Sequence, residues 1–172
     1  CDSLALEKIT NFLRVFLKSF EKINNAYLEV RTKSTKIDVL KSIKPMKNVI
    51  IAYSLNPEII VKGFEQKTPT LKKRINSINS LQKLGWQIGL RFDPLINYSK
   101  NRLIYKNFFG YIFSKIQVEK IHSVTTGHFR MPNNFFNKLV NIRSEDSLIF
   151  HKLKNDKLLR CQTQRKECEE EL

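Results

Sequence analysis

The amino-acid sequence predicts an α/β protein built around a parallel sheet. Short apolar segments of strand length alternate along the chain with amphipathic segments of helix length. A leading helix is followed by strand and helix four times over, and parallel strands require such crossover helices. The 172 residues, 41% of them hydrophobic, suffice for one globular domain. The pattern leaves open a doubly wound sheet or a (β/α) barrel, of which four strands would form an incomplete part.

The first half of the chain contains a helix followed by two strands. Residues 3–21 predict one helix, because apolar residues recur there at steps of three and four: Leu6, Ile9, Leu13, Phe16 and Phe20. Residues 26–31 predict a strand, and the segment behind the following "RTKST" could form a short helix. The nearly continuous apolar run "NVIIAYSLN", residues 48–56, suits a strand that is covered on both faces.

The second half begins with the clearest helix of the chain. In "KTPTLKKRINSINSLQKLGW", Thr68 is the expected N-cap, Pro69 the first helical residue and Gly85 the stop. Residues 86–92 then alternate between apolar and polar, which predicts a strand ending at Asp93-Pro94. The remaining elements are an amphipathic helix at 103–112, a weaker strand at 120–127 and a helix after Pro132.

The net charge of +15, from 31 Lys and Arg against 16 Asp and Glu, favours binding to a polyanion such as nucleic acid. A second interpretation is compositional. Lys, Asn and Ile are abundant together, as AT-rich coding produces, and the lysines are scattered along the whole chain. A basic α/β nucleic-acid-binding fragment without catalytic activity therefore stays open as an alternative function.

The sequence has neither a signal peptide nor an initial Met, and we expect a piece of a longer protein. No stretch approaches eighteen uninterrupted apolar residues, so we expect a soluble chain without a membrane partner. Cys1, Cys161 and Cys168 form no C-x-x-C pair and lack the spacing of a metal site. They are expected to be ordinary thiols in a reducing cytoplasm.

Polar residues follow every predicted strand. These ends are Thr32-Lys33-Ser34, Ser54-Leu55-Asn56, Asp93-Pro94 and residues 125–130. Helix capping accounts for any single one of them, but in parallel α/β folds ligands gather at the C-terminal strand ends. Together these ends supply a cation, hydroxyls, an amide, a carboxylate and an arginine, which suits a ligand with carboxylate and amine groups. Nucleotide-binding fingerprints such as G-x-G-x-x-G follow none of the strands.

Four segments carry a resemblance to a known family: "AYLEVRTKST", "NVIIAYSLNP", "TPTLKKRINSINSLQKLGWQIGLRFDPLI" and "TTGHFRMP". They resemble the C-terminal two-thirds of spore photoproduct lyase and its relatives, which are radical S-adenosylmethionine enzymes of the DNA repair photolyase type. "DSLALEKIT" is similar to the family's second-helix entry. The resemblance implies that residues 1–143 are the C-terminal part of a radical S-adenosylmethionine (β/α)6 barrel. The charged residues 144–172 would form a tail outside the family pattern.

The resemblance also implies two cofactors, S-adenosylmethionine and a 4Fe-4S cluster. The cluster loop C-x-x-x-C-x-x-C does not occur in this sequence, so we expect the chain alone to be inactive. By position, Lys33 would face S-adenosylmethionine, and Ser54 would lie at the next strand end. Asn56 and Asp93 would line the same mouth, and Cys1 would take a place where relatives often carry serine.

The implied reaction is reductive cleavage of S-adenosylmethionine to a 5′-deoxyadenosyl radical, which takes hydrogen from a thymine-dimer lesion in DNA and leads to two thymines. The family's hydrogen-donor cysteine would fall two residues before Cys1, outside this sequence. His128 and Arg130, with flanking lysines, are expected to contact DNA phosphates near the barrel mouth. For His122, inside the weaker strand, we expect an ordinary structural hydrogen-bonding role.

Overall fold

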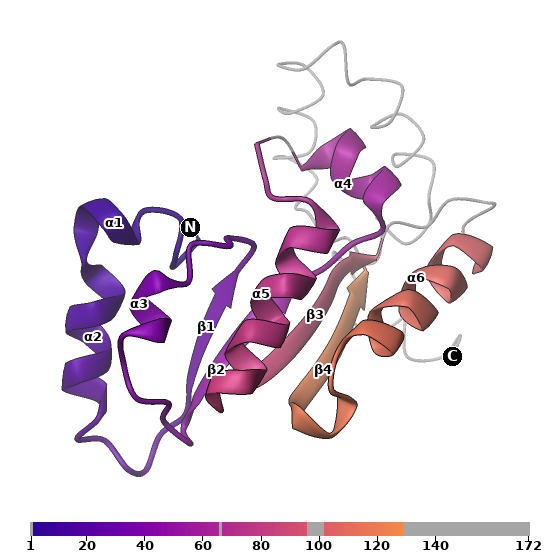
Figure 1. The fold of residues 1–172 in the computed structure, drawn as a ribbon. Helices are drawn as coiled ribbons and strands as arrows, with labels where there is room; N and C mark the ends of the chain where they lie inside the picture. The colour runs from indigo at the N-terminus through magenta and orange to yellow at the C-terminus, as the bar shows by residue number, and fades with distance from the viewer. Residues whose placement is uncertain (1, 66, 96–101, 129–172) are drawn as a thin grey trace, which may run out of the picture. The chain divides into compact units, whose positions relative to one another are not determined.

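A computed structural model describes residues 2–65, 67–95 and 102–128 (Figure 1). The chain divides into two compact units, residues 1–127 and 128–172, and of the second only His128 is described. The expected boundary between a barrel part and a tail at 143/144 and the helix after Pro132 therefore lie outside the described residues.

Four strands form a single sheet in sequential order. They are β1 (Leu28–Thr32), β2 (Val49–Ser54), β3 (Gln87–Leu95) and β4 (Ile121–His128), with the spatial order β1-β2-β3-β4. The strands are parallel, and their arrowheads end at one edge of the sheet (Figure 1). The register sets Thr32 opposite Tyr53 and Ser54 opposite Arg91, so β1 and β2 end within one residue of each other, and β3 runs on past Arg91 to Leu95.

Six helices and one 3-10 turn accompany the sheet in the described part of the chain. They are α1 (Glu7–Thr10), α2 (Phe12–Phe20), α3 (Asp38–Lys41), α4 (Glu58–Phe64), α5 (Leu71–Leu84), α6 (Arg102–Lys115) and the turn Val118–Lys120. None of these helices combines the length and the apolar character that a membrane-spanning helix needs.

One apolar core lies on a single face of the sheet. Alternate strand residues such as Val30, Ile51 and Leu90 belong to it, together with side chains of α2, α3, α5 and α6. Residues of the opposite parity, such as Arg31 and Arg91, lie outside this core. Strands in sequential order with helices on one face are the arrangement of a (β/α) barrel, whereas a doubly wound sheet carries helices on both faces. The predicted α/β class is confirmed, and the structure decides for the partial barrel.

The prediction of one helix over residues 3–21 is wrong in its continuity, and its buried face is confirmed at Leu13 and Phe20 but not at the other three positions. The helix is interrupted at Asn11, which adopts a left-handed conformation with φ of 49°. The buried Glu7 carboxylate accepts the N–H groups of Leu13 (2.8 Å) and Arg14 (3.0 Å), so it caps α2. After this break α2 buries Leu13, Leu17 and Phe20. The expected core residues Leu6, Ile9 and Phe16 are exposed.

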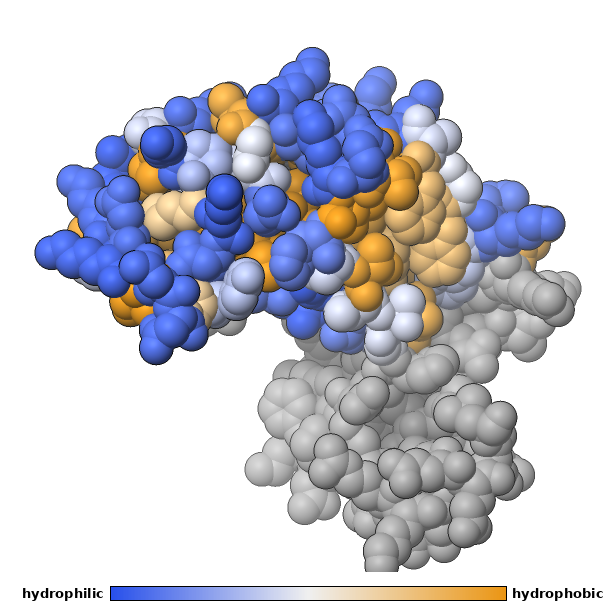
Figure 2. Space-filling model, turned by 90° about the horizontal axis from the view of Figure 1, so that it is seen from below, coloured by the Kyte–Doolittle hydropathy of each residue, from blue (hydrophilic) through white to orange (hydrophobic). Residues whose placement is uncertain are grey.

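The other elements agree with the sequence apart from their ends. Gly85 closes α5 with φ of 94°, as predicted. The N-cap of α5 is Thr70, whose hydroxyl accepts the N–H of Lys73 at 3.4 Å, so the assignment of Thr68 and Pro69 to these positions is wrong. β3 continues through Asp93-Pro94 to Leu95, and α4 was not predicted. Seen from below, the described surface is mostly hydrophilic, with the largest group of apolar residues right of centre and smaller groups elsewhere (Figure 2).

Candidate functional site

The structure brings four of the predicted site residues to the same edge of the sheet. Lys33 follows β1 directly, Ser54 is the last residue of β2, and Asn56 lies two residues beyond it. Asp93 lies in β3, two residues after the partner of Ser54. Cys1 and Arg130 lie outside the described residues. His128 ends β4, and the structure does not describe its side chain.

Glu65, which follows α4, is the centre of this cluster. Its Oε1 accepts a hydrogen bond from Asn56 Nδ2 at 3.0 Å and pairs with the Lys33 ammonium at 2.9 Å. Its Oε2 pairs with the guanidinium of Arg74, a fully buried side chain of α5 that also donates to the Ser54 carbonyl at 3.0 Å. Glu65 therefore joins residues that follow two different strands and a residue of α5 through one carboxylate.

The carboxylate of Glu65 stays charged although its side chain is only 6% exposed. Burial raises the pKa of Glu65, but hydrogen bonds from Asn56, Lys33 and Arg74 outweigh this effect and hold the pKa below its usual value. The pKa of Glu29 is also lowered, chiefly by its hydrogen bond with Arg91, although burial opposes this.

This cluster predicts a loss of stability in acid. A carboxyl group whose pKa is lower in the folded state stabilises the fold above its unfolded pKa, which is near 4.3 for Glu. That contribution is lost as the pH falls through the folded pKa. We expect the free energy of unfolding, measured with urea, to fall as the pH is lowered from about 5 to 3. Glu65→Gln should reduce this pH dependence, and an identical dependence in the variant would contradict the assignment to Glu65.

Asn56 presents an acceptor that no donor in the described part of the chain reaches. The residue is 2% exposed, and its Oδ1 is the buried side-chain polar atom that lacks a hydrogen-bond partner within the described residues. Turning the amide over would set Oδ1 against the Glu65 carboxylate, so the bond from Nδ2 fixes the orientation. A buried acceptor without a donor costs about 1–3 kcal/mol, and such a group calls for a missing partner. The chemistry of this partner is that of an N–H or O–H donor.

The "RTKST" segment is anchored by hydrogen bonds that fix the backbone of Lys33, while the Lys33 side chain stays partly exposed. Asp2 accepts hydrogen bonds from the Thr32 hydroxyl (2.7 Å) and from the N–H of Lys33 (2.6 Å). The Thr32 hydroxyl accepts the N–H of Ser34 at 2.9 Å. Tyr53 of β2 donates its hydroxyl to the carbonyl of Ser34 at 3.1 Å, and burial raises the pKa of this phenol, so it remains a donor. The side chain of Lys33 is 34% exposed.

The sheet face opposite the helices is polar and is here called the inner face, with Glu29, Arg31, Ser54, Arg91 and Asp93 as its members. Arg31 donates to the Ser54 hydroxyl at 3.2 Å and pairs with Asp93 at 3.1 Å. Arg91 crosses β2 to bind Glu29. The inner face is continuous with the strand-end cluster of Lys33, Ser54, Asn56, Glu65 and Arg74, because Ser54 belongs to both.

Gly89 and Ala52 make room for the arginine that crosses the inner face. A Cβ atom added at Gly89 would lie 2.9–3.1 Å from the guanidinium of Arg91. Ala52 is opposite Gly89 on β2 and is fully buried. The two small residues let Arg91 lie flat between Glu29 and Ser123, whose hydroxyl is 3.0 Å away.

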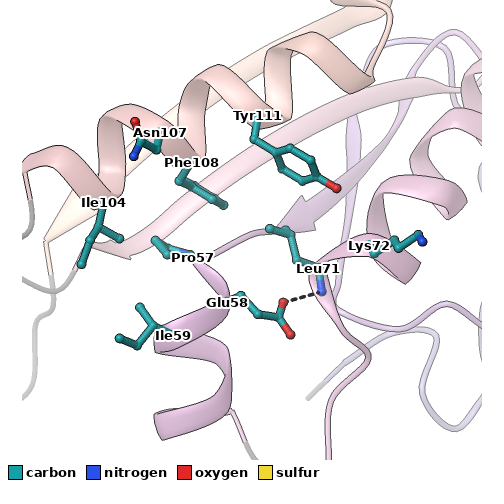
Figure 3. Close-up of a pocket in the computed structure, with 9 residues that line it drawn as sticks. All are labelled: Pro57, Glu58, Ile59, Leu71, Lys72, Ile104, Asn107, Phe108 and Tyr111. Carbon is teal, nitrogen blue, oxygen red and sulfur yellow. Dashed lines mark hydrogen bonds between the residues drawn. The ribbon is translucent and has the colours of Figure 1, made fainter.

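A pocket of about 500 Å³ lies on the helix side of the molecule, between α4, α5 and α6 (Figure 3). Its lining includes Ile59, Leu71 and Phe108, and Glu58 there accepts the N–H of Leu71 at 3.2 Å. The predicted site residues do not line it. The pocket is therefore separate from the strand-end cluster.

The sequence-based reasoning missed the two residues that organise the cluster, Glu65 and Arg74. The predicted site was composed of residues at the ends of strands, whereas Glu65 follows α4 and Arg74 lies within α5. One signal was present in the sequence: Arg74 occupies a position on the buried side of a helix, between Leu71 and Ile75. A charged residue at such a position requires a buried partner.

The fold and the strand-end cluster define an incomplete (β/α) barrel with a polar site at the C-terminal strand ends. A structure of a spore photoproduct lyase double mutant with bound AdoMet and dinucleoside spore photoproduct has the same fold. The TM-score is 0.68 at 15% identity, over 74% of this chain and 38% of that one.

The model of the spore photoproduct lyase family matches residues 1–160, and the chain belongs to this family. It is 21% identical to a spore photoproduct lyase of Clostridium acetobutylicum, over 82% of this chain and 42% of that protein. It is 23% identical to a spore photoproduct lyase of Bacillus subtilis, over 72% of this chain and 36% of that protein. The chain thus spans less than half the length of these relatives.

Proposed function

We propose that this chain is the cofactor- and substrate-facing part of a spore photoproduct lyase-like enzyme that repairs thymine-dimer-type lesions in DNA. Within a family of this fold, one observation carries the proposal. Within the described residues the buried Oδ1 of Asn56 lacks a donor, and it lies in the same cluster as Lys33, whose side chain is 34% exposed. An acceptor and a cation at the C-terminal strand ends suit a ligand with an amine and a carboxylate.

The residues of this cluster fit S-adenosylmethionine. Lys33 would pair with its carboxylate as a point charge, and Asn56 Oδ1 would accept a hydrogen bond from its ammonium. Ser54 and Asp93 would line the same mouth, and Cys1 is proposed to lie nearby. When bound, S-adenosylmethionine would supply the 5′-deoxyadenosyl radical that takes hydrogen from the lesion. The described residues contribute binding and orientation to this chemistry.

The chain does not fit a 4Fe-4S cluster by itself. Its three cysteines lack the C-x-x-x-C-x-x-C spacing, and in the described residues no group of three His, Cys, Asp or Glu side chains could hold a metal ion. We propose that an N-terminal barrel portion outside this sequence supplies the cluster ligands. The scattered cysteines suit the reducing cytoplasm that such a protein would occupy.

DNA is the proposed macromolecular partner. The net charge of +15 favours phosphate binding, and Arg31 at the mouth of the inner face is 47% exposed on its side chain. An exposed ion pair such as Arg31–Asp93 contributes little, so Arg31 can exchange its carboxylate partner for a phosphate. His128 and Arg130 remain proposed phosphate contacts.

The alternative function, a basic α/β nucleic-acid-binding fragment without chemistry, is favoured by the same net charge. The two functions differ in what Lys33 does. A nucleic-acid binder would lose about one phosphate contact with Lys33→Ala, as with any other surface lysine. A cofactor site would lose its carboxylate partner.

The proposed function predicts that Lys33→Ala weakens S-adenosylmethionine binding by about 10- to 100-fold, as expected for a lost charge-assisted hydrogen bond. The gene extended upstream would be expressed and purified without oxygen. Dissociation constants and 5′-deoxyadenosine formation after reduction would then be measured. Arg74 would still pair with Glu65, so the variant leaves no buried carboxylate without a cation.

Lys83→Ala is the matched control, since Lys83 lies in the last turn of α5, at the end of the helix away from Arg74 and the strand-end cluster. It should bind S-adenosylmethionine like the wild type. Equal, small effects of both substitutions on DNA binding, with no binding of S-adenosylmethionine by the wild type, would favour the nucleic-acid-binding fragment.

A further inference from the structure

We infer that the pocket between α4, α5 and α6 binds one nucleotide of the DNA strand beside the lesion, with the base in the pocket and a phosphate on Lys72. The inference rests on the proposed function and deepens it, because it names a second contact with the same partner. The pocket would bind and position the strand, and would take no part in the reaction at the strand ends.

The pocket has the size and the lining of a site for a flat apolar group. Its volume of about 500 Å³ lies within the ~300–1,000 Å³ that small-molecule pockets span. Leu71 and Phe108 line it and are each 6% exposed. Figure 3 shows Ile104, Phe108 and Tyr111 extending from α6 toward α4 and α5. Tyr111 is 41% exposed, and an accessible aromatic ring beside apolar side chains suits a nucleobase, which gains by stacking.

The polar groups of the pocket are largely left for a ligand. The side chains of Lys72, Asn107 and Tyr111 are exposed and have no hydrogen bond or ion pair with residues 2–65, 67–95 and 102–128. The carboxylate of Glu58, in contrast, is engaged by the N–H of Leu71 at 3.2 Å. The Lys72 ammonium can pair with a phosphate, and the Asn107 amide offers both a donor and an acceptor to the edge of a base.

The charges around the pocket favour an anionic ligand. Residues 57–74 form α4 and the start of α5, and they contain four exposed lysines: Lys62, Lys67, Lys72 and Lys73. The two carboxylates of the same segment, Glu58 and Glu65, are both bound within the fold. The charge that remains is positive. A neutral apolar molecule would make no use of it, whereas a nucleotide joins a flat ring to a phosphate.

The pocket also lies close to the strand-end cluster along the chain. Ile59 lines the pocket and follows Asn56 by three residues, so their Cα atoms are at most about 11 Å apart. Arg74 joins the first turn of α5 to the end of β2 by its hydrogen bond with the Ser54 carbonyl at 3.0 Å. Stacked nucleotides follow one another at about 3.4 Å along a strand. A strand whose lesion lies at the strand ends therefore passes the pocket within about four nucleotides.

The test removes one base at a time. The probe is a fluorescent single-stranded oligonucleotide with one central spore photoproduct, the lesion bound in the related structure, and an abasic residue at each neighbouring position in turn. Dissociation constants would be measured by fluorescence anisotropy on the upstream-extended protein, purified without oxygen and left unreduced. We expect one position within about four nucleotides of the lesion at which the missing base weakens wild-type binding roughly 5- to 100-fold.

Tyr111→Ala should remove this dependence on the base. The intact strand should bind the variant about as weakly as the abasic strand binds the wild type, and the abasic residue should then cost less than about twofold, as expected for two partners of one contact. Tyr111→Phe keeps the ring and should restore binding of the intact strand. Because Tyr111 is 41% exposed, these changes should leave the melting temperature close to that of the wild type.

Lys72→Ala tests the phosphate contact. The slope of the logarithm of affinity against the logarithm of salt concentration should become shallower by about 0.7, the value for one phosphate of a single strand. Lys83→Ala is the matched control, because Lys83 is an exposed lysine in the last turn of the same helix and does not line the pocket. It should leave the slope unchanged.

The outcomes separate the inference from the function on which it rests. Tight binding of the lesion strand with no base-dependent position, or with the same dependence in Tyr111→Ala, would overturn the inference and leave the proposed function standing. Self-association of the wild type that Tyr111→Ala abolishes, with DNA affinity unchanged, would assign the pocket to a second copy of the chain and overturn it as well. A wild-type protein that binds the lesion strand no more tightly than an unmodified strand would overturn the proposed function, and the inference with it.

Discussion

Replacing Arg74 with alanine is expected to lower the free energy of unfolding by about 3–5 kcal/mol. The guanidinium is fully buried and donates to the carbonyls of Pro69 and Ser54, at 2.9 and 3.0 Å, besides its pair with Glu65. Alanine would leave these carbonyls without their donor and the buried carboxylate with Lys33 as its remaining cation. Urea denaturation of the chain, followed by far-ultraviolet circular dichroism, measures the change.

Arg14→Ala is the matched control for this experiment. Arg14 is exposed and donates one hydrogen bond from its side chain, to the Ser42 hydroxyl at 3.0 Å. Its replacement should cost less than about 1 kcal/mol. Arg74→Lys keeps the charge but not the planar fork of donors, and an intermediate loss is expected. If Arg74→Ala were as stable as Arg14→Ala, the buried guanidinium would not be what holds the cluster together.

The fold could be predicted from the sequence because its signals are local. The apolar run that became β2 is buried at every position, as a strand covered on both faces requires. Gly85 ends α5 because its φ of 94° is one that other residues rarely adopt. The choice between barrel and doubly wound sheet was not available from such signals. It depends on strand order and on which face the helices cover, and both arise from packing between distant segments.

The error at the N-terminus has a different cause. Apolar residues at steps of three and four predicted one helical stripe, of which Leu13 and Phe20 are buried and the other members, Leu6, Ile9 and Phe16, are exposed. The buried stripe, with Leu13 and Leu17, begins after the break at Asn11. The spacing of apolar residues does not reveal this break, because the break depends on the Glu7 carboxylate, which caps α2. Such a cap is set by the fold of the segment.

Four residues of the candidate site were predictable, and the two that organise it, Glu65 and Arg74, were not. Lys33, Ser54, Asn56 and Asp93 could be found because parallel strands end at one edge, whatever else the chain does. Glu65 reaches the same edge through α4 and the turn after it, and the sequence pattern did not predict α4. The residue that orients the site is therefore the one whose position depends most on tertiary structure.

Phe92→Ala is expected to destabilise the chain by about 3–5 kcal/mol, as other buried aromatic-to-alanine changes do. Phe92 is 1% exposed and lies at the centre of an aromatic cluster that joins β3 to α6. Its ring meets those of Phe108, Phe109 and Phe113 edge-on, with centroids 5.6, 4.9 and 6.3 Å away. Because Asp93 follows directly, the same packing supports the end of β3 at the candidate site.

Phe12→Ala is the matched control, because it makes the same chemical change at an exposed position. Phe12 is 61% exposed and its ring stacks on Phe16 at 5.7 Å, outside the core. Its loss should cost less than about 1 kcal/mol, while Phe92→Ala should lower the melting temperature by roughly 6–20 °C. Similar melting temperatures for the two variants would contradict the assignment of the inward and outward faces. They would equally undermine the placement of Asp93 at the mouth, because one alternation along β3 turns Phe92 to the core and Asp93 to the inner face.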